Sequence, residues 1–204
     1  MGCTESVELP EHFAQFQTWT APRVSGMIKA YMDGEYDFGI DHTVVMTLTG
    51  LGLEQSKVLI KALSKGDSII INATVFLLTV VMLSEPNRRI EASQIHMAFD
   101  IFDFNMAGSI SFDEFSIMLL CVATAQGAII CEQDGVPSDM SMIVVAETMY
   151  EILNKTKSHS ISKEEIVQLW KEYFIAHGVS SIDTSFARFR MGKNVCLWEA
   201  EEEG

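Results

Sequence analysis

The sequence predicts an all-α fold, because apolar residues recur at helical spacing in segments separated by short polar gaps. Strand-like runs are confined to a few residues around Ile70 and Ile110. Of the 204 residues, 48% are hydrophobic and only 4 are proline, which is enough apolar material for a packed core. A chain of this length fits one domain or two small lobes.

The helical segments can be placed in order along the chain. Residues 1–20 look irregular and end at a break formed by Ala21 and Pro22. The expected helices are 24–32, 55–63, 73–83, 89–102, 112–124, 143–153 and 163–177. The apolar run Ile69 to Leu83 is too short to span a bilayer and predicts a buried helix. Residues 127–140 contain glycine and proline and predict a long loop. Residues 178–204 are weakly patterned and end in a run of glutamates, which predicts a solvated tail.

Residues 103–114 carry the clearest motif, with oxygen-bearing side chains at regular places, a glycine at the sixth and an isoleucine at the eighth. This pattern predicts a calcium loop, because calcium takes oxygen ligands and the glycine permits the sharp turn. The expected ligands are Asp103, Asn105, the carbonyl of Ser109, Ser111 through a water, and Glu114. Ala107 stands at the fifth place, so only two carboxylates remain and we expect a weak site, with a dissociation constant on the order of 10⁻⁵ to 10⁻³ M. The alternative is a loop that keeps its shape and stays empty at cellular calcium.

Three further segments fit the same frame less well. In 154–165, Glu165 stands at the twelfth place, but the oxygens of Asn154, Thr156 and Ser158 are neutral. A histidine replaces the glycine and three lysines would repel a cation, so an empty loop is expected. Residues 64–75 contain Lys65 and Val75 in place of ligands. Residues 33–44 are acidic but lack the closing glutamate, which favours a solvated turn. The isoleucines at the eighth places predict two pairs of loops, each joined by a short two-stranded contact; they are Ile40, Ile71, Ile110 and Ile161.

Residues 99–119, with apolar faces on both sides of the best loop, resemble the EF-hands of the calmodulin-like superfamily, and the resemblance extends loosely over 30–174. It implies EF-hand pairs in two lobes, and a calcium sensor or adaptor that presents an apolar groove to a partner helix. The segment from Phe99 is also similar to EF-hand subunits of sperm CatSper channels. The expected organisation is an N-terminal segment 1–22, a degenerate EF-hand pair 23–84, a second pair 88–177 and a tail 178–204.

The N-terminus begins Met-Gly-Cys-Thr-Glu-Ser, which fits the pattern for N-myristoylation at Gly2 with palmitoylation at Cys3. Two acyl chains would anchor the protein stably to a membrane, whereas one gives only marginal binding. The alternative is that the first residues match by chance. Acylated EF-hand proteins such as the recoverin-like sensors and calflagins share an N-terminal glycine. This resemblance and the acylation pattern predict that the protein lies at the cytoplasmic face of a membrane or in a cilium or flagellum.

Composition excludes several function classes. The net charge of −14 argues against nucleic-acid binding, which needs clustered Lys and Arg. Four cysteines without paired spacing or a secretion signal predict no zinc site, no disulfides and a reduced intracellular compartment. No catalytic motif is found, so we do not expect an enzyme. Two functions stay open: a calcium-modulated adaptor that recruits a partner, and a calcium-independent structural scaffold in a larger assembly such as an axoneme.

Overall fold

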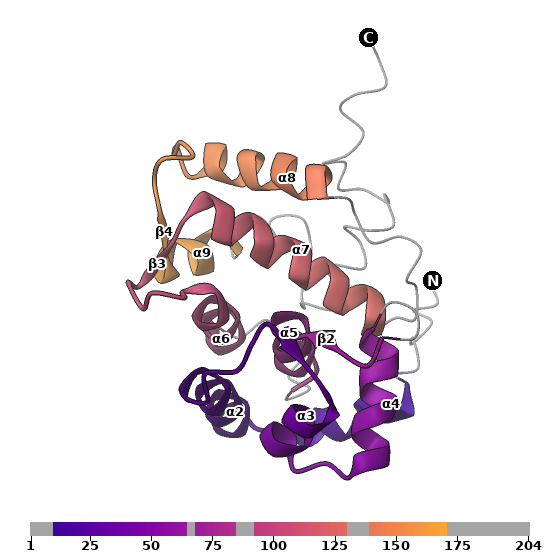
Figure 1. Ribbon diagram of the computed structural model, residues 1–204. Coiled ribbons are helices and arrows are strands. Elements are labelled where there is room, and N and C mark those ends of the chain that lie inside the picture. Colours follow the sequence, from indigo (N-terminus) through magenta and orange to yellow (C-terminus); the bar gives the residue numbers. More distant parts are fainter. Residues whose placement is uncertain (1–9, 65–67, 85–91, 130–138, 171–204) are drawn as a thin grey trace, which may run out of the picture.

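The computed structural model of the protein describes residues 10–64, 68–84, 92–129 and 139–170 (Figure 1). This part is mostly helical, in agreement with the predicted class. The helices are α1 (Glu11–Ala14), the 3-10 helix η1 (Gln15–Thr18), α2 (Ala21–Asp33), α3 (His42–Thr49), α4 (Leu53–Leu63), α5 (Ala73–Leu83), α6 (Ala92–Phe102), α7 (Phe112–Ile129), α8 (Asp139–Ile152) and α9 (Lys163–Trp170). The strands are β1 (Gly39–Ile40), β2 (Ile71–Asn72), β3 (Ser109–Ile110) and β4 (Ile161–Ser162).

The four short strands form two antiparallel pairs. Ile40 lies opposite Ile71 in the pair of β1 with β2, and Ile110 lies opposite Ile161 in the pair of β3 with β4. All four side chains are buried. The predicted pairing of the four isoleucines is therefore confirmed in its register, and each pair ties two loops together.

Helix α5 is the buried helix that the apolar run predicts. Every residue from Ala73 to Leu83 except Met82 is buried. The helix begins at Asn72, whose side-chain oxygen accepts hydrogen bonds from the backbone N–H groups of Thr74 and Val75, at 2.9 and 3.2 Å. It packs against both α6 and α7, and in Figure 1 it lies near the middle of the molecule.

Residues 1–20 were expected to be irregular, but the part of them that the structure describes is largely helical. Residues 11–18 form α1 and η1, and they bury Phe13 and Phe16, with Trp19 directly after them. The physical reason is the spacing of these three aromatic residues, since side chains three positions apart share one face of a helix. Pro22 lies in the first turn of α2, where its missing N–H costs no hydrogen bond, so the expected break is instead the start of a helix.

Other elements also differ from expectation. Helix α3 (His42–Thr49) was not expected; Asp41 caps its start and Gly50 its end. Helix α7 continues past Thr124 to Ile129, because Ala125 and Gly127 are buried on its core face. Helix α8 begins at Asp139. The expected loop 127–140 is therefore helical at both of its ends.

The buried residues of both halves form one continuous cluster rather than two separate cores. Helix α2 contacts α6, and α4 contacts α7, while the Phe38 and Phe104 rings meet edge to face with centroids 5.6 Å apart. The strand pairs thus belong to two halves that share a core.

Within the described residues, α7 has the length and apolar composition that a membrane span requires. The buried core helices of soluble proteins also meet this test, and half of α7 is buried here.

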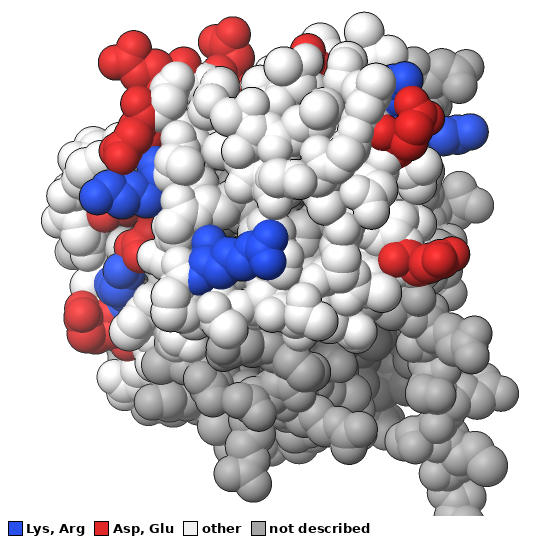
Figure 2. All heavy atoms as spheres, turned by 90° about the horizontal axis from the view of Figure 1, so that it is seen from below, with Lys and Arg blue, Asp and Glu red and all other residues white. Residues whose placement is uncertain are grey.

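The charge of the chain does not gather into a single patch on the face formed by the lower helices. Figure 2 shows that this underside of the molecule is mostly uncharged, with acidic side chains towards its margins and few basic ones. The net charge of −14 therefore does not mark a site on this face by itself.

Candidate metal centre

The loop between α6 and α7 turns sharply within a few residues. The N–H of Asp103 still donates to the carbonyl of Phe99 at 3.1 Å, so the loop starts directly at the helix end. Met106 and Gly108 then take positive φ angles of 54° and 72°. A Cβ built on Gly108 would meet nothing within 4 Å, so the glycine serves backbone conformation rather than space.

The first two expected ligands bind the backbone of their own loop. Asp103 accepts hydrogen bonds from the N–H of Ala107 at 2.9 Å and from the N–H of Gly108 at 2.8 Å, one with each carboxylate oxygen. Asn105 accepts from the same Ala107 N–H at 3.0 Å. These bonds draw the Asp103 and Asn105 oxygens towards one peptide group. Ala107 supplies no side-chain oxygen, but its N–H holds the side-chain oxygens of Asp103 and Asn105 in place.

The last two expected side-chain ligands form a cap at the start of α7. One oxygen of Glu114, Oε2, accepts from both the N–H and the hydroxyl of Ser111, at 2.7 and 2.8 Å. The N–H of Glu114 donates back to the Ser111 hydroxyl at 3.3 Å. Both bonds use Oε2, so Oε1 is the carboxylate oxygen left to take another partner. Ser109 lies in β3, opposite Ser162.

The loop offers the kind of ligand that calcium binds, which is oxygen, but fewer ligands than calcium takes. Calcium takes six to eight oxygen ligands, and the loop offers oxygens from Asp103, Asn105, the Ser109 carbonyl, Ser111 and Glu114. Only two of these groups are charged. Among the residues that the structure describes, no group of three or more His, Cys, Asp or Glu is arranged to hold a metal ion. A cation here would depend on neutral oxygens and water as well as the two carboxylates.

The 154–165 loop is closed by contacts of its own. The ammonium of Lys155 lies 2.9 Å from Glu165 Oε1 and donates to the Ser160 carbonyl at 2.8 Å. Thr156 contacts the His159 Nδ1 atom both through its hydroxyl, at 2.8 Å, and through its N–H, at 3.2 Å. The lysine that was expected only to repel a cation therefore points into its own loop.

The other two lysines of this segment are also paired with carboxylates. Lys157 forms an ion pair with Glu147 of α8, and Lys163 forms one with Asp100 of α6. Burial acts to raise the pKa of Glu165, but the Ser162 N–H and the Lys155 ammonium together hold that pKa below its ordinary value. The positive charges are thus neutralised locally, which the sequence alone did not reveal.

The acidic 33–44 segment uses one of its carboxylates for helix capping. Asp41 accepts from the N–H groups of Thr43 and Val44, at 2.9 and 3.1 Å, and these bonds lower its pKa. Asp33, Glu35 and Asp37 are exposed. The 64–75 segment is described only from residue 68 onward after Ser64, and its Asn72 caps α5. Asp41 and Asn72 thus serve the starts of α3 and α5.

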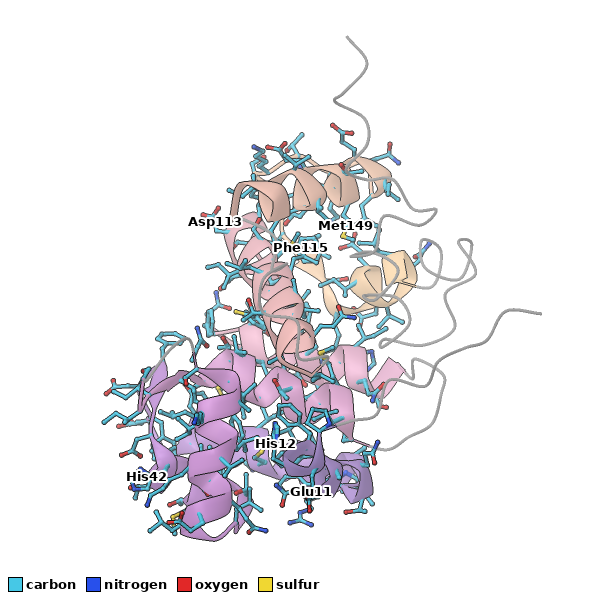
Figure 3. All side chains as sticks on the ribbon, turned by 90° about the vertical axis from the view of Figure 1, so that its right-hand side faces the viewer. Glu11, His12, His42, Asp113, Phe115 and Met149 are labelled. Carbon is cyan, nitrogen blue, oxygen red and sulfur yellow. The ribbon has the colours of Figure 1, made fainter. Side chains whose placement is uncertain are left out.

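A tyrosine that the motif search did not single out lies beside the candidate site. Tyr150 of α8 is 2% exposed, and its ring packs against Phe112 and Phe115 at centroid distances of 5.1 and 5.9 Å. Its hydroxyl has no hydrogen-bond partner among the residues that the structure describes. Burial, followed by the charges of Asp113, Glu114 and Glu165, raises the pKa of Tyr150 to about 12. Figure 3 shows Phe115 of α7 and Met149 of α8 facing the space between these helices, with Asp113 on the outside.

An apolar pocket lies where four helices of the structure meet. Its lining includes Leu78, Met82, Ile95, Met118, Val122 and Ile166, from α5, α6, α7 and α9. Two methionines, Met82 and Met118, belong to this lining. The candidate acylation sites Gly2 and Cys3, and the tail 178–204, lie outside the described residues.

Comparison of the chain with models of known protein families, and with curated protein sequences, finds no match.

Proposed function

We propose that the protein is an EF-hand adaptor of the calmodulin-like kind, with one weak calcium site in the 103–114 loop and a second loop that needs no metal. The observation that carries this proposal is the inward arrangement of the Asp103 and Asn105 oxygens over the Ala107 N–H, followed by the Glu114 cap. The pairing of Ile110 with Ile161 supports it, because the EF-hand arrangement joins two loops by such a contact.

The residues that would hold calcium are those of the loop itself. Asp103 and Glu114 would supply the charge, while Asn105, the Ser109 carbonyl and Ser111 would supply neutral oxygens. Bound calcium would supply positive charge that draws the start and the end of the loop together. Because α6 ends at Phe102 and α7 begins at Phe112, any movement of these ligands changes the angle between the two helices.

The partner in this proposal is an apolar helix of another protein. To reach the apolar cavity of about 30 Å³ between α5, α6, α7 and α9, it would have to move these helices apart, because most of the lining side chains are buried. The pocket lining is almost wholly apolar and contains methionines, whose flexible side chains adapt to different partner shapes.

The N-terminal sequence supports a location at a membrane or in a cilium or flagellum through acylation of Gly2 and Cys3. Labelling with myristate and palmitate analogues tests this: incorporation unchanged in Gly2→Ala and Cys3→Ser would overturn it.

Calorimetric calcium titration tests the metal site. The wild-type protein should bind one calcium with a dissociation constant on the order of 10⁻⁵ to 10⁻³ M. Glu114→Gln should weaken binding at least about tenfold, because it removes one of two carboxylates in the site. Asp113→Asn is the matched control, since it removes the same charge from the neighbouring exposed residue and should change affinity by less than about twofold. Equal effects of the two substitutions would contradict the proposed ligand set.

The second candidate function is a calcium-independent structural scaffold in a larger assembly. The contact of Lys155 with Glu165 favours it, because that loop is closed without a metal. The same titration separates the two functions. Absence of heat from the wild-type protein up to millimolar calcium would favour the scaffold.

A further inference from the structure

We propose that the ammonium of Lys155 is the resident cation of the 154–165 loop and holds this loop in a closed form without metal. This inference rests on the proposed function only in describing the two segments as a pair of related loops. The contacts that carry it lie within the 154–165 segment and across one strand pair.

The lysine contacts the two groups that would otherwise meet a cation. Counted from Asn154, Ser160 is at the seventh place, where a calcium loop offers a carbonyl, and Glu165 is at the twelfth, where it offers a carboxylate. The Lys155 ammonium lies 2.8 Å from the first and 2.9 Å from the second. One ammonium thus links the middle of the loop to its end.

The base of the lysine is also fixed. Its backbone N–H donates to the carbonyl of Tyr150 at 2.9 Å, so the side chain starts from the end of α8. The side chain is only 19% exposed, which is low for a lysine. The other oxygen of Glu165 accepts from the Ser162 N–H at 2.8 Å, so both carboxylate oxygens are engaged.

This arrangement opposes the entry of a metal ion. A divalent cation would have to take the Ser160 carbonyl and the Glu165 carboxylate away from a group that is already positive. Two like charges a few ångströms apart repel, and they repel most where water is partly excluded. The neutral oxygens of Asn154, Thr156 and Ser158 offer no compensating charge.

The internal cation has a consequence for the neighbouring loop. Ser160 and Ser162 flank Ile161 of β4, which lies opposite Ile110 of β3. Holding Ser160 and Glu165 therefore also holds the strand against which the 103–114 loop is built. The 154–165 loop, which carries its own cation, does not respond to calcium.

A double-mutant cycle on the full-length chain, measured by thermal unfolding in excess chelator, tests this proposal. Because no metal is present, the outcome does not depend on whether the 103–114 loop binds calcium. Lys155→Met should lower the melting temperature by about 2–8 °C, since a loss of one to two kcal/mol shifts it by about 2–4 °C per kcal/mol in a chain of this size. Lys157→Met, which breaks the more exposed pair with Glu147, should lower it by less than about 2 °C.

The second arm of the cycle keeps the test decisive if one variant folds poorly. Glu165→Gln should also lower the melting temperature. The double variant Lys155→Met with Glu165→Gln should lose clearly less than the sum of the two single losses, because both changes remove the shared contact between Lys155 and Glu165. Additive losses, or equal losses for Lys155→Met and Lys157→Met, would overturn the assignment.

Discussion

Gly108 has a positive φ angle at the centre of the candidate site. Its φ is 72°, a value that residues with a side chain rarely adopt, while open space surrounds the position of a Cβ. Gly50, at the end of α3, has the same character: its φ is 74° and it also has nothing within 4 Å. The two glycines therefore have nearly the same backbone conformation, but only Gly108 lies in the candidate site. Gly50 can thus serve as the control for a substitution at Gly108.

Substitution of each glycine by alanine tests whether the 103–114 loop must keep its turn to bind calcium. Gly108→Ala and Gly50→Ala should each lower the free energy of unfolding by about 1 kcal/mol, because alanine is strained at positive φ. Urea unfolding measures both losses. Only Gly108→Ala should also weaken calcium binding in the calorimeter, and a similar weakening by Gly50→Ala would show that the effect is general destabilisation.

Helix α5 shows how one capping residue supports the shared core at the scale of an element. The Asn72 side-chain oxygen accepts from two backbone N–H groups and, at 2.6 Å, from the Thr74 hydroxyl. Free N–H groups at the start of a helix need such partners, and here the first turn of the helix is buried.

Removal of this cap should destabilise the protein by a measurable amount. Asn72→Ala should lower the free energy of unfolding by about 1–2 kcal/mol, whereas Asn72→Asp, which keeps an acceptor at the same place, should cost less than about half of that. Urea unfolding followed by circular dichroism provides the measurement. Equal losses for the two variants would mean that the side-chain oxygen does not act as a cap.

The elements differ in how well the sequence predicts them. Helix α5 and the four paired isoleucines are visible in the sequence, since burial on all sides and an eighth-place isoleucine leave clear patterns. Helix α3 is not visible, because it is eight residues long and rich in threonine and valine, which have low helix propensity. Its formation depends on Asp41, Gly50 and contacts with α2 and α4, and contacts between distant segments are not written in any local pattern.

The same limit applies to the candidate site. Asp103, Asn105, Ser111 and Glu114 follow from their spacing, and the structure gives each of them a hydrogen bond within the loop. The inward direction of Lys155 could not be predicted, because a long side chain reaches many positions. The sequence feature that points to this contact is a lysine at the second place of a loop in which the first, third and fifth places carry neutral oxygens.

At the scale of the whole molecule, the two strand pairs belong to halves that share a core. The buried cluster contains Phe16 and Ile40 from the first half together with Phe99 and Ile161 from the second. Contacts of α5 with α6 and α7 join the halves. A change at the 103–114 loop therefore acts on a single packed body.

The most direct test of this account is a calcium titration followed by amide NMR on the uniformly labelled wild-type protein. We expect the amide signals of Ala107 and Gly108 to shift in a saturable way, because both N–H groups donate to the Asp103 carboxylate, and we expect Glu114→Gln to weaken the response. The amide of His159, in the loop closed by Lys155, should shift far less. Shifts centred on the 154–165 loop, or none in either loop up to millimolar calcium, would contradict the account.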